Sequence, residues 1–275
     1  MCRSLLLFIF ALGVFSPCPA VHAQEPTPMA EWQLSPGVQL IPFFIEKIPK
    51  WQGVVAAGAV TLPTYEGARQ NRVIPIAAAE LRYRDIAYAS SSEGIGFNLM
   101  RGKSYRIGAS FGYDIGRAEK RDVRLKGLGD LDAAPEVKMY AEKVLFPFVL
   151  RTTVLHTFAD EAGWLADFAF YLPVAGSKKL LVLAGPSVTL ANEDAMLRRF
   201  GVSAAQSARS GLPQYTPGAG LRNAALGFSA TWFIDEAWFV NATGSVQKLL
   251  GPAADSPLIE RETQMALLLV GGYRW

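Results

Sequence analysis

The chain has 275 residues, 51% of them hydrophobic, and its formal net charge is +3 at pH 7. This near balance of charge gives no electrostatic basis for binding nucleic acid, so a nucleic-acid partner is excluded. Both cysteines, Cys2 and Cys18, lie at the N-terminus, and His156 is the one histidine beyond residue 22. We therefore expect no metal site and no bound cofactor.

The first 23 residues have the features of a cleavable signal peptide. Arg3 gives a positive start, residues 5–15 form a short apolar core, and Val21-His-Ala23 has the small-x-small pattern of a cleavage site. The core is too short to cross a bilayer as a helix, which takes about 20 residues. We predict a signal peptide over residues 1–23, with cleavage between Ala23 and Gln24.

Most of the remaining sequence alternates apolar and polar residues with a period of two. Successive side chains of a strand point to opposite faces, so this alternation predicts strands with one apolar and one polar face. The segment 221–234 is typical: its apolar row is Ala224, Leu226, Phe228, Ala230, Trp232 and Ile234, and its polar row includes Asn223, Ser229 and Thr231. The segments 105–116 and 163–172 follow the same rule.

A soluble β-sandwich also alternates, but two features favour a transmembrane barrel. Aromatic residues lie near strand ends, as in interfacial girdles, and the faces opposite the apolar rows are rich in small polar residues. The chain also ends in a strand whose apolar row finishes with Tyr273 and Trp275. This ending resembles the signal read by the barrel-assembly machinery, so we predict that these two residues form that signal.

The predicted fold class is all-β: a transmembrane antiparallel up-and-down barrel over residues 50–275, in the outer membrane of a Gram-negative bacterium. Eleven strands are expected, over residues 53–62, 72–83, 86–97, 105–116, 136–144, 146–158, 163–172, 179–190, 221–234, 237–249 and 264–275. Such barrels have an even number of strands, short periplasmic turns and long outer loops. A periplasmic C-terminus places the long connections 117–135, 191–220 and 250–263 outside, provided that one more strand precedes residue 53.

That strand is expected within Trp32 to Ile45, in an N-terminal extension over residues 24–49. We therefore predict twelve strands, with ten as the alternative.

Several separated motifs carry a family resemblance. The first is Tyr65-Glu66-Gly67, and the blocks 94–99, 112–117 and 125–132 follow, the last containing Gly129, Asp130 and Asp132. The most specific are residues 201–213, with Ser207, Arg209, Ser210 and Gly211, and residues 250–257, which end in Asp255, Ser256 and Pro257. In order and spacing these motifs resemble the MipA/OmpV family of MltA-interacting outer-membrane proteins, over about residues 50 to 275.

The resemblance implies an outer-membrane barrel and does not imply catalysis. For some members it implies a scaffold that links a membrane-bound lytic transglycosylase to a murein synthase. The expected partners are accordingly outer-membrane lipid and lipopolysaccharide, the barrel-assembly machinery and these two enzymes. The alternative from another class is a small-solute channel or adsorption protein.

Two patterns suggest catalysis, and the barrel explains both better. Gly108-Ala-Ser-Phe-Gly112 matches the hydrolase pattern G-x-S-x-G, which requires a strand-to-helix turn, yet Ser110 falls inside an alternating strand. His156 is the one serious enzymatic candidate, because outer-membrane lipid hydrolases pair histidine with serine on a barrel wall. No carboxylate in its own strand is placed to orient it. We predict no catalytic residue.

Two outer connections carry further features. The mixed-charge segment 117–126 is interpreted as a solvated loop, with contact to anionic lipopolysaccharide as the alternative. Residues 194–200 have helical character, and Ser203 or Ser207 is expected to cap a following turn. The motif 207–211 indicates either a recognition surface or a loop folded into the lumen.

Overall fold

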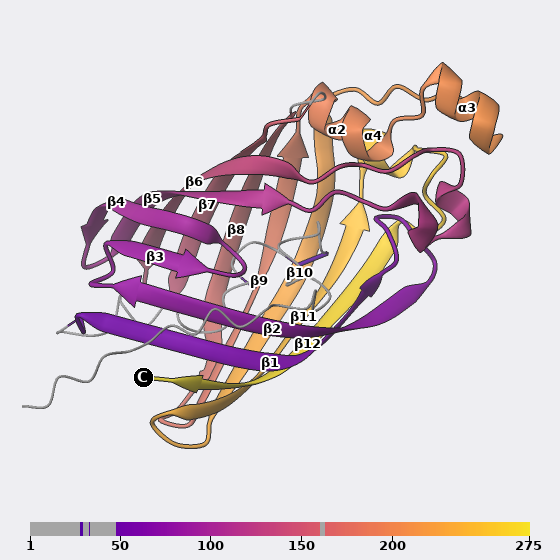
Figure 1. The fold of residues 1–275 in the computed structure, drawn as a ribbon. Coiled ribbons are helices and arrows are strands. Elements are labelled where there is room, and N and C mark those ends of the chain that lie inside the picture. The colour runs from indigo at the N-terminus through magenta and orange to yellow at the C-terminus, as the bar shows by residue number, and fades with distance from the viewer. Residues whose placement is uncertain (1–27, 30–32, 34–47, 160–162) are drawn as a thin grey trace, which may run out of the picture.

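The computed structural model describes residues 28–29, 33, 48–159 and 163–275. Twelve antiparallel strands form one sheet, which closes into a barrel when the first strand pairs with the last (Figure 1). In chain order they are β1 Trp51–Pro63, β2 Asn71–Tyr83, β3 Ala87–Ser90, β4 Gly94–Gly102, β5 Tyr105–Asp114, β6 Ala134–Leu145, β7 Phe148–Thr157, β8 Gly163–Gly176, β9 Leu180–Ala191, β10 Gly220–Phe233, β11 Trp238–Leu249 and β12 Thr263–Arg274. The predicted fold class and strand number are confirmed.

The predicted origin of the twelfth strand is wrong. The range 86–97, expected as one strand, contributes to two, β3 and β4, because the chain reverses over residues 91–93. Ser90 Oγ accepts from the backbone N–H of Ser92 and Glu93 at 3.2 and 3.4 Å. Gly94 then has φ +76, which glycine adopts freely. Local side-chain hydrogen bonds of this kind compete with the extended conformation that the alternation predicts.

The barrel closes without the strand expected within Trp32 to Ile45. Those residues lie outside the described part of the chain, apart from Gln33. Residues 54–61 of β1 pair directly with residues 267–274 of β12, which leaves no place between them for a further strand. The signal peptide and the cleavage site at Ala23 and Gln24 also lie outside the described residues.

Alternation gives the barrel an apolar outer face and a polar inner face. On β10, Leu226, Phe228 and Trp232 are exposed, whereas Ser229 and Thr231 between them are buried. Closure of the sheet pairs most backbone N–H and C=O groups of the strands, and an exposed apolar band of this kind is stable when acyl chains surround it. The predicted faces are thus confirmed. Among the described residues, no helix is both long and apolar enough to cross a bilayer.

The two ends of the barrel differ in the length of their connections. Residues 84–86, 103–104, 146–147, 177–179 and 234–237 form short turns at the end that holds the C-terminus. In the last of these, the Asp235 carboxylate accepts from the backbone N–H of Ala237 and Trp238 at 2.7 Å each. The long connections lie at the opposite end, and this asymmetry makes the C-terminal end periplasmic.

The barrel wall is shorter along the barrel axis at β3 and β4 than at the other strands. β3 pairs with β2 only over Glu80 to Tyr83. Within the described residues, Asn71–Ala78 therefore has a strand partner only on its β1 side. Pro75 lies in this edge and has no N–H to leave unpaired. Figure 1 shows β3 and β4 beside only the periplasmic part of β2, so the turn 91–93 lies partway along the barrel.

Candidate functional site

Four connections at the outer end pack into one structure, which we call the loop cap: residues 64–70, 115–133, 192–219 and 250–262. Its apolar core contains residues from all four connections, namely Tyr65, Ala68, Leu125, Leu128, Val202, Leu212 and Leu258. Leu125 and Val202 have no exposed surface. Because the connections share a core of their own, they form an ordered cover rather than separate solvated loops.

The two longer helices of the loop cap begin at side-chain caps. Asn192 Oδ1 accepts from the N–H of Ala195 at the start of α2, Glu193–Phe200. Ser203 caps α3, Ala204–Ser210, and forms a capping box with Gln206. A third helix, α4, covers Gly251–Ala254, and two 3-10 turns, η2 and η3, cover Glu119–Arg121 and Val123–Leu125. The predicted helical character is confirmed, with Ser203 rather than Ser207 as the cap.

The motif Tyr65-Glu66-Gly67 fastens the first connection to the last. The Tyr65 hydroxyl donates to the Leu258 carbonyl oxygen at 2.9 Å and lies 3.2 Å from a carboxylate oxygen of Glu260. The Gly67 carbonyl accepts from the N–H of Glu260 and Arg261, at 2.9 Å each. Segments about 190 residues apart are therefore joined through both side chain and backbone.

The acidic motif of the second connection organises its own loop and holds α2. Asp130 Oδ1 accepts from the Glu119 N–H at 2.6 Å. The Asp132 carbonyl accepts from Arg198 of α2 at 2.8 Å. Gly129 has φ +80, a conformation that glycine adopts without strain.

The motif of residues 207–211 ends α3. Ser207 Oγ donates to the Leu212 carbonyl at 2.6 Å, and Ser210 Oγ accepts from the Leu212 N–H at 3.2 Å. Gly211 has φ +76 at the C-cap, and Arg209 donates to a carbonyl of the second connection at 3.1 Å. None of the α3 residues is buried, and Figure 1 shows α3 at the outer edge of the cap. The motif therefore lies outside the lumen.

The last motif holds α4 against the other connections. Ser256 Oγ donates to the Phe200 carbonyl at 2.6 Å, and the Pro257 carbonyl accepts from Arg124 at 2.5 Å. Asp255 ends α4. The structure thus brings the motif residues of the four outer connections into the loop cap, whereas the block 94–99 lies in β4.

Tyr273 and Trp275 lie at the opposite end of the barrel. The Tyr273 ring packs edge-on against Trp238 with centroids 5.0 Å apart. The Trp275 backbone pairs with Gly53 through two hydrogen bonds of 3.1 Å. Both side chains are exposed beside the periplasmic turns, where an interfacial girdle is expected.

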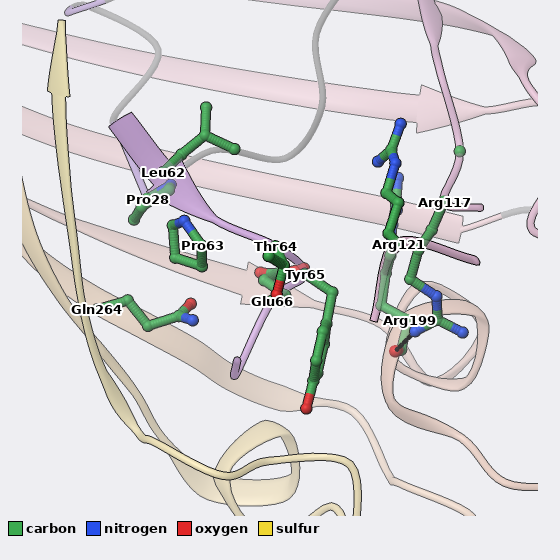
Figure 2. Close-up of a pocket in the computed structure, with 11 residues that line it drawn as sticks. Pro28, Leu62, Pro63, Thr64, Tyr65, Glu66, Arg117, Arg121, Arg199 and Gln264 are labelled. Atoms are coloured by element: carbon green, nitrogen blue, oxygen red, sulfur yellow. Dashed lines mark hydrogen bonds between the residues drawn. The ribbon is translucent and has the colours of Figure 1, made fainter. Parts of the chain in front are cut away.

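A pocket lies beneath the loop cap, between the end of β1 and the connection 115–133 (Figure 2). Its lining includes Arg117, Arg121 and Arg199 against one carboxylate, Glu66. Glu66 forms an ion pair with Arg222. Burial and the neighbouring guanidinium of Arg199 lower the pKa of Arg117 to about 10. Arg199 pairs with Asp114, so Arg117 is the guanidinium of this lining that gives the pocket positive charge without a carboxylate partner among the described residues.

Six side chains form a ring of alternating charge inside the barrel, on its periplasmic side; we call it the charge ring. The nitrogen–oxygen distances around it are 3.8 Å for Arg82–Asp85, 3.0 Å for Arg106–Asp85, 2.7 Å for Arg106–Glu142, 3.1 Å for Arg151–Glu142, 3.1 Å for Arg151–Glu93 and 3.7 Å for Arg82–Glu93. Every side chain in it is 6% exposed or less. Each charge faces at least two opposite charges, and Arg82 also pairs with Glu80, which offsets the cost of burial.

A left-handed turn brings Asp85 into this ring. Arg84 and Asp85 have φ +49 and +54, which is uncommon for residues other than glycine. Asn98 Nδ2 donates to the Asp85 carbonyl and carboxylate oxygens at 2.7 and 3.0 Å. The turn therefore aims the carboxylate at Arg106.

The structure separates the two residues considered as catalytic candidates, Ser110 and His156. Ser110 is buried on the inner face of β5. His156 lies on the other face of the wall, where it stacks on Trp164 with ring centroids 4.3 Å apart and meets Phe158 edge-on at 4.7 Å. Its Nδ1 contacts the Gly163 carbonyl at 3.2 Å. A serine–histidine pair cannot form across the wall. Among the described residues, no cluster of acidic or histidine side chains is placed to hold a metal ion.

The sequence model of the family described as MltA-interacting protein MipA matches residues 55–275, a span that includes all twelve strands in whole or in part. The chain belongs to this family. Similar solved structures include a "Bacterial polysaccharide outer membrane secretin", 10% identical over 84% of this chain and 100% of that chain, with a TM-score of 0.45. Another is OmpTdeltaL8 of Vibrio cholerae, 6% identical over 82% and 98%, with a TM-score of 0.40. No curated protein matches the chain significantly in sequence.

This MipA-family chain is an outer-membrane protein. Family membership and the closed barrel with its apolar outer face agree on that location. The loop cap then lies outside the cell and the charge ring nearer the periplasm, because the short turns mark the periplasmic end.

Three residues at the outer mouth of the MipA-family barrel escaped the sequence reasoning. Arg222 turns inward because β10 has a bulge between Leu221 and Asn223, so two neighbouring residues point to the lumen. Arg199 lies near the end of α2 and pairs with Asp114 at the end of β5. The third, Gln264, begins the inner row of β12. Of the three, only Gln264 had a signal in the sequence, because the alternation of β12 places it in the inward-facing row.

Proposed function

We propose that the protein is a non-catalytic scaffold of the outer membrane whose periplasmic turns bind murein-turnover enzymes, a lytic transglycosylase and a murein synthase. The family description names an interaction with MltA, and the family resemblance links MltA to this class of enzyme. The observation that best supports a scaffold is that side chains of the barrel wall and of the N-terminal extension occupy space within the lumen. A barrel that presents surfaces needs no open path, whereas a channel does.

The charge ring projects into the lumen from one side of the barrel. From the opposite side, neutral polar side chains project inward and hydrogen-bond to one another. Asn241 and Thr243 of β11 have no exposed surface. Asn241 Nδ2 donates to Ser229 Oγ at 3.0 Å, and Thr243 Oγ1 lies 2.9 Å from the same oxygen. Polar side chains that bond to one another in this way leave little demand for lumenal water.

The described residues of the N-terminal extension also lie within the barrel. Gln33 Nε2 donates to the carbonyls of Phe228 and Gly244 at 3.1 and 2.7 Å, and the side chain is 1% exposed. Met29 packs in a core cluster with Val54 and Phe239. A side chain of the extension thus occupies space that a solute would need. This packing favours the scaffold over a small-solute channel or adsorption protein.

Site-specific photo-crosslinking in intact envelopes tests the proposal. A photoreactive residue at Lys103, Phe146 or Lys178 faces the periplasm, whereas the same residue at Val123 in the loop cap provides the matched control. We expect adducts with a lytic transglycosylase or a murein synthase from the periplasmic positions alone, identified by mass spectrometry. Equal adducts from both ends, or none with murein enzymes, would contradict the scaffold.

Planar-bilayer recordings test the alternative. The purified barrel is expected to give no reproducible conductance steps, because side chains of the wall and of the N-terminal extension occupy its lumen. Regular steps together with absent murein-enzyme adducts would replace the scaffold with the channel.

A further inference from the structure

We propose that the pocket beneath the loop cap is a binding site for a small oxyanion, a carboxylate or phosphate group carried by a hydroxylated molecule such as a sugar acid or sugar phosphate. The proposal goes beyond the scaffold role and does not depend on it. Four observations support it: the balance of charge in the pocket, the buried polar atoms that lack partners, the shape of the site and the cover above it.

The first observation is an excess of buried positive charge. Arg117, 8% exposed, has no carboxylate partner within the described part of the chain, and its guanidinium donates there only to the Arg199 carbonyl, at 3.3 Å. The nearby carboxylates are already paired: Glu66 with Arg222, and Asp114 with Arg198 and Arg199. Protein groups therefore do not neutralise Arg117. A buried guanidinium that presents a rigid fork of donors is well matched to a carboxylate or phosphate.

The electrostatic state of Arg117 agrees with this shortage. Burial, and after it the charge of Arg199, lowers the pKa of Arg117 to about 10. The charge of Glu66 raises the pKa of Arg117, but by less than burial and Arg199 together lower it. An anion between the two guanidiniums would reverse the shift, because a nearby negative charge favours the protonated form.

The second observation concerns hydrogen-bonding atoms around the pocket. Arg117 Nε, Glu66 Oε2 and both amide atoms of Gln264 are buried without a partner among the described residues. Gln264 is 2% exposed. Buried polar groups are normally paired, so these atoms indicate a ligand or ordered water. Two of the four are donors and two are acceptors. A bare anion satisfies only the donors, whereas a molecule that also carries hydroxyl groups satisfies both kinds.

The third observation is the arrangement of the side chains. Figure 2 shows Gln264 on the opposite side of the view from Arg117, Arg121 and Arg199, with residues 63–66 between them. The pocket is partly open to solvent, and its enclosed part is small, about 30 Å³. We therefore place only the oxyanion group inside it, with the rest of the ligand in the opening, where Leu62 and Pro63 supply an apolar surface.

The fourth observation is that the loop cap builds this pocket. Glu66, Arg117 and Arg199 come from three different connections of the cap, whose core fixes them relative to one another. Thr64, also in the lining, donates through Oγ1 to Asp122 at 2.7 Å and so ties the first connection to the second. The family motifs that fold the cap therefore also preorganise the pocket.

Isothermal titration calorimetry on the full-length barrel in non-ionic micelles tests the proposal with inorganic phosphate, glucose 6-phosphate and glucose as probes. We expect saturable binding of the two phosphates, tighter for glucose 6-phosphate, and none of glucose. The substitution Arg117→Gln should weaken both by about tenfold or more, the loss expected for a charged hydrogen-bond partner. Arg261→Gln, an exposed arginine of the cap outside the pocket lining, is the matched control and should change affinity less than twofold.

Thermal unfolding gives a second readout that also shows whether each variant folds. Phosphate should raise the unfolding temperature of the wild type and of Arg261→Gln, and leave that of Arg117→Gln unchanged. If Arg117→Gln does not fold, Arg117→Lys takes its place, and phosphate should raise its unfolding temperature less than that of the wild type, because lysine lacks the planar fork of donors. Absence of saturable binding, or an equal loss in Arg261→Gln, would overturn the site.

Lipopolysaccharide distinguishes two sources of the same chemistry. If added lipopolysaccharide competes with phosphate for the wild type, the anion is a lipid headgroup phosphate. If it does not compete, the ligand is a free solute. Both outcomes keep the oxyanion site, and neither uses the murein enzymes, so failure of the scaffold proposal leaves this test intact.

Discussion

The guanidinium of Arg151 on β7 meets the carboxylate of Glu93 at 3.1 Å, although 58 residues separate them. Glu93 lies in the turn that ends the short strand β3, and Arg151 also contacts Glu142 at 3.1 Å. The contact therefore fixes the low part of the wall to the taller strands beside it. The charge ring is in this sense a structural element of the barrel.

Replacing Arg151 by glutamine should destabilise the barrel by about 3–5 kcal/mol, because removal of one partner leaves Glu93 and Glu142 buried without full compensation. Urea unfolding in phospholipid vesicles, followed by tryptophan fluorescence, measures the change. The matched control is Lys248→Gln, which breaks the exposed pair Lys248–Glu262 at 3.5 Å. That change should cost less than about 1 kcal/mol. Equal effects would refute the structural role of the ring.

Tyr65→Phe should loosen the loop cap without unfolding the barrel. The substitution removes the hydroxyl that contacts Leu258 and Glu260 and leaves a buried carbonyl without its donor, at a cost of about 1–3 kcal/mol. Hydrogen exchange should therefore accelerate in residues 250–262 and stay unchanged in β12. Tyr113→Phe, on the exposed outer face of β5, is the control. Faster exchange throughout the barrel would show that the cap is not a separate unit.

Substitutions at two glycines of the loop cap distinguish the cost of backbone strain from the cost of a steric clash. Gly67 has φ +96, and a Cβ there would lie 2.2 Å from Ile259 Cδ1. Gly129 has φ +80, and a Cβ there would meet nothing within 4 Å. Gly129→Ala should therefore cost only the strain of the left-handed region, about 1 kcal/mol, and Gly67→Ala should cost more. The rate of protease digestion of the outer loops on intact cells shows which substitution destabilises the loop cap more. Faster digestion of Gly129→Ala than of Gly67→Ala would contradict the contact with Ile259.

The sequence predicts features that depend on local periodicity. The outer row of β10, the tight turn at Asp235 and the capped helix after Ser203 follow from alternation, turn chemistry and capping, and the structure contains all three. The family motifs singled out residues of the outer connections, but did not predict that these residues meet in one cap, because their contacts join segments far apart in the chain.

The features that the sequence does not predict are those in which the alternation of a strand is interrupted or in which distant strands pair. Ser90 bonds to the following backbone and divides one predicted strand into two. The bulge before Asn223 turns Arg222 toward Glu66. The charge ring depends on pairings between distant strands, which no short pattern encodes. Its residues read simply as the polar row of each strand.

The central claim is that acyl chains solvate the outer row of each strand. The two cysteines, Cys2 and Cys18, lie in the predicted signal peptide, so single cysteines can be placed along β12 of the processed chain without background. Spin labels at residues 264–273 in bilayers report collisions with oxygen, which concentrates in lipid, and with a polar nickel reagent. We predict high oxygen accessibility at Met265, Leu267, Leu269 and Tyr273, and low accessibility at Gln264, Ala266, Leu268 and Val270. Uniform accessibility to the nickel reagent along the strand, without a period of two, would contradict the barrel in its membrane.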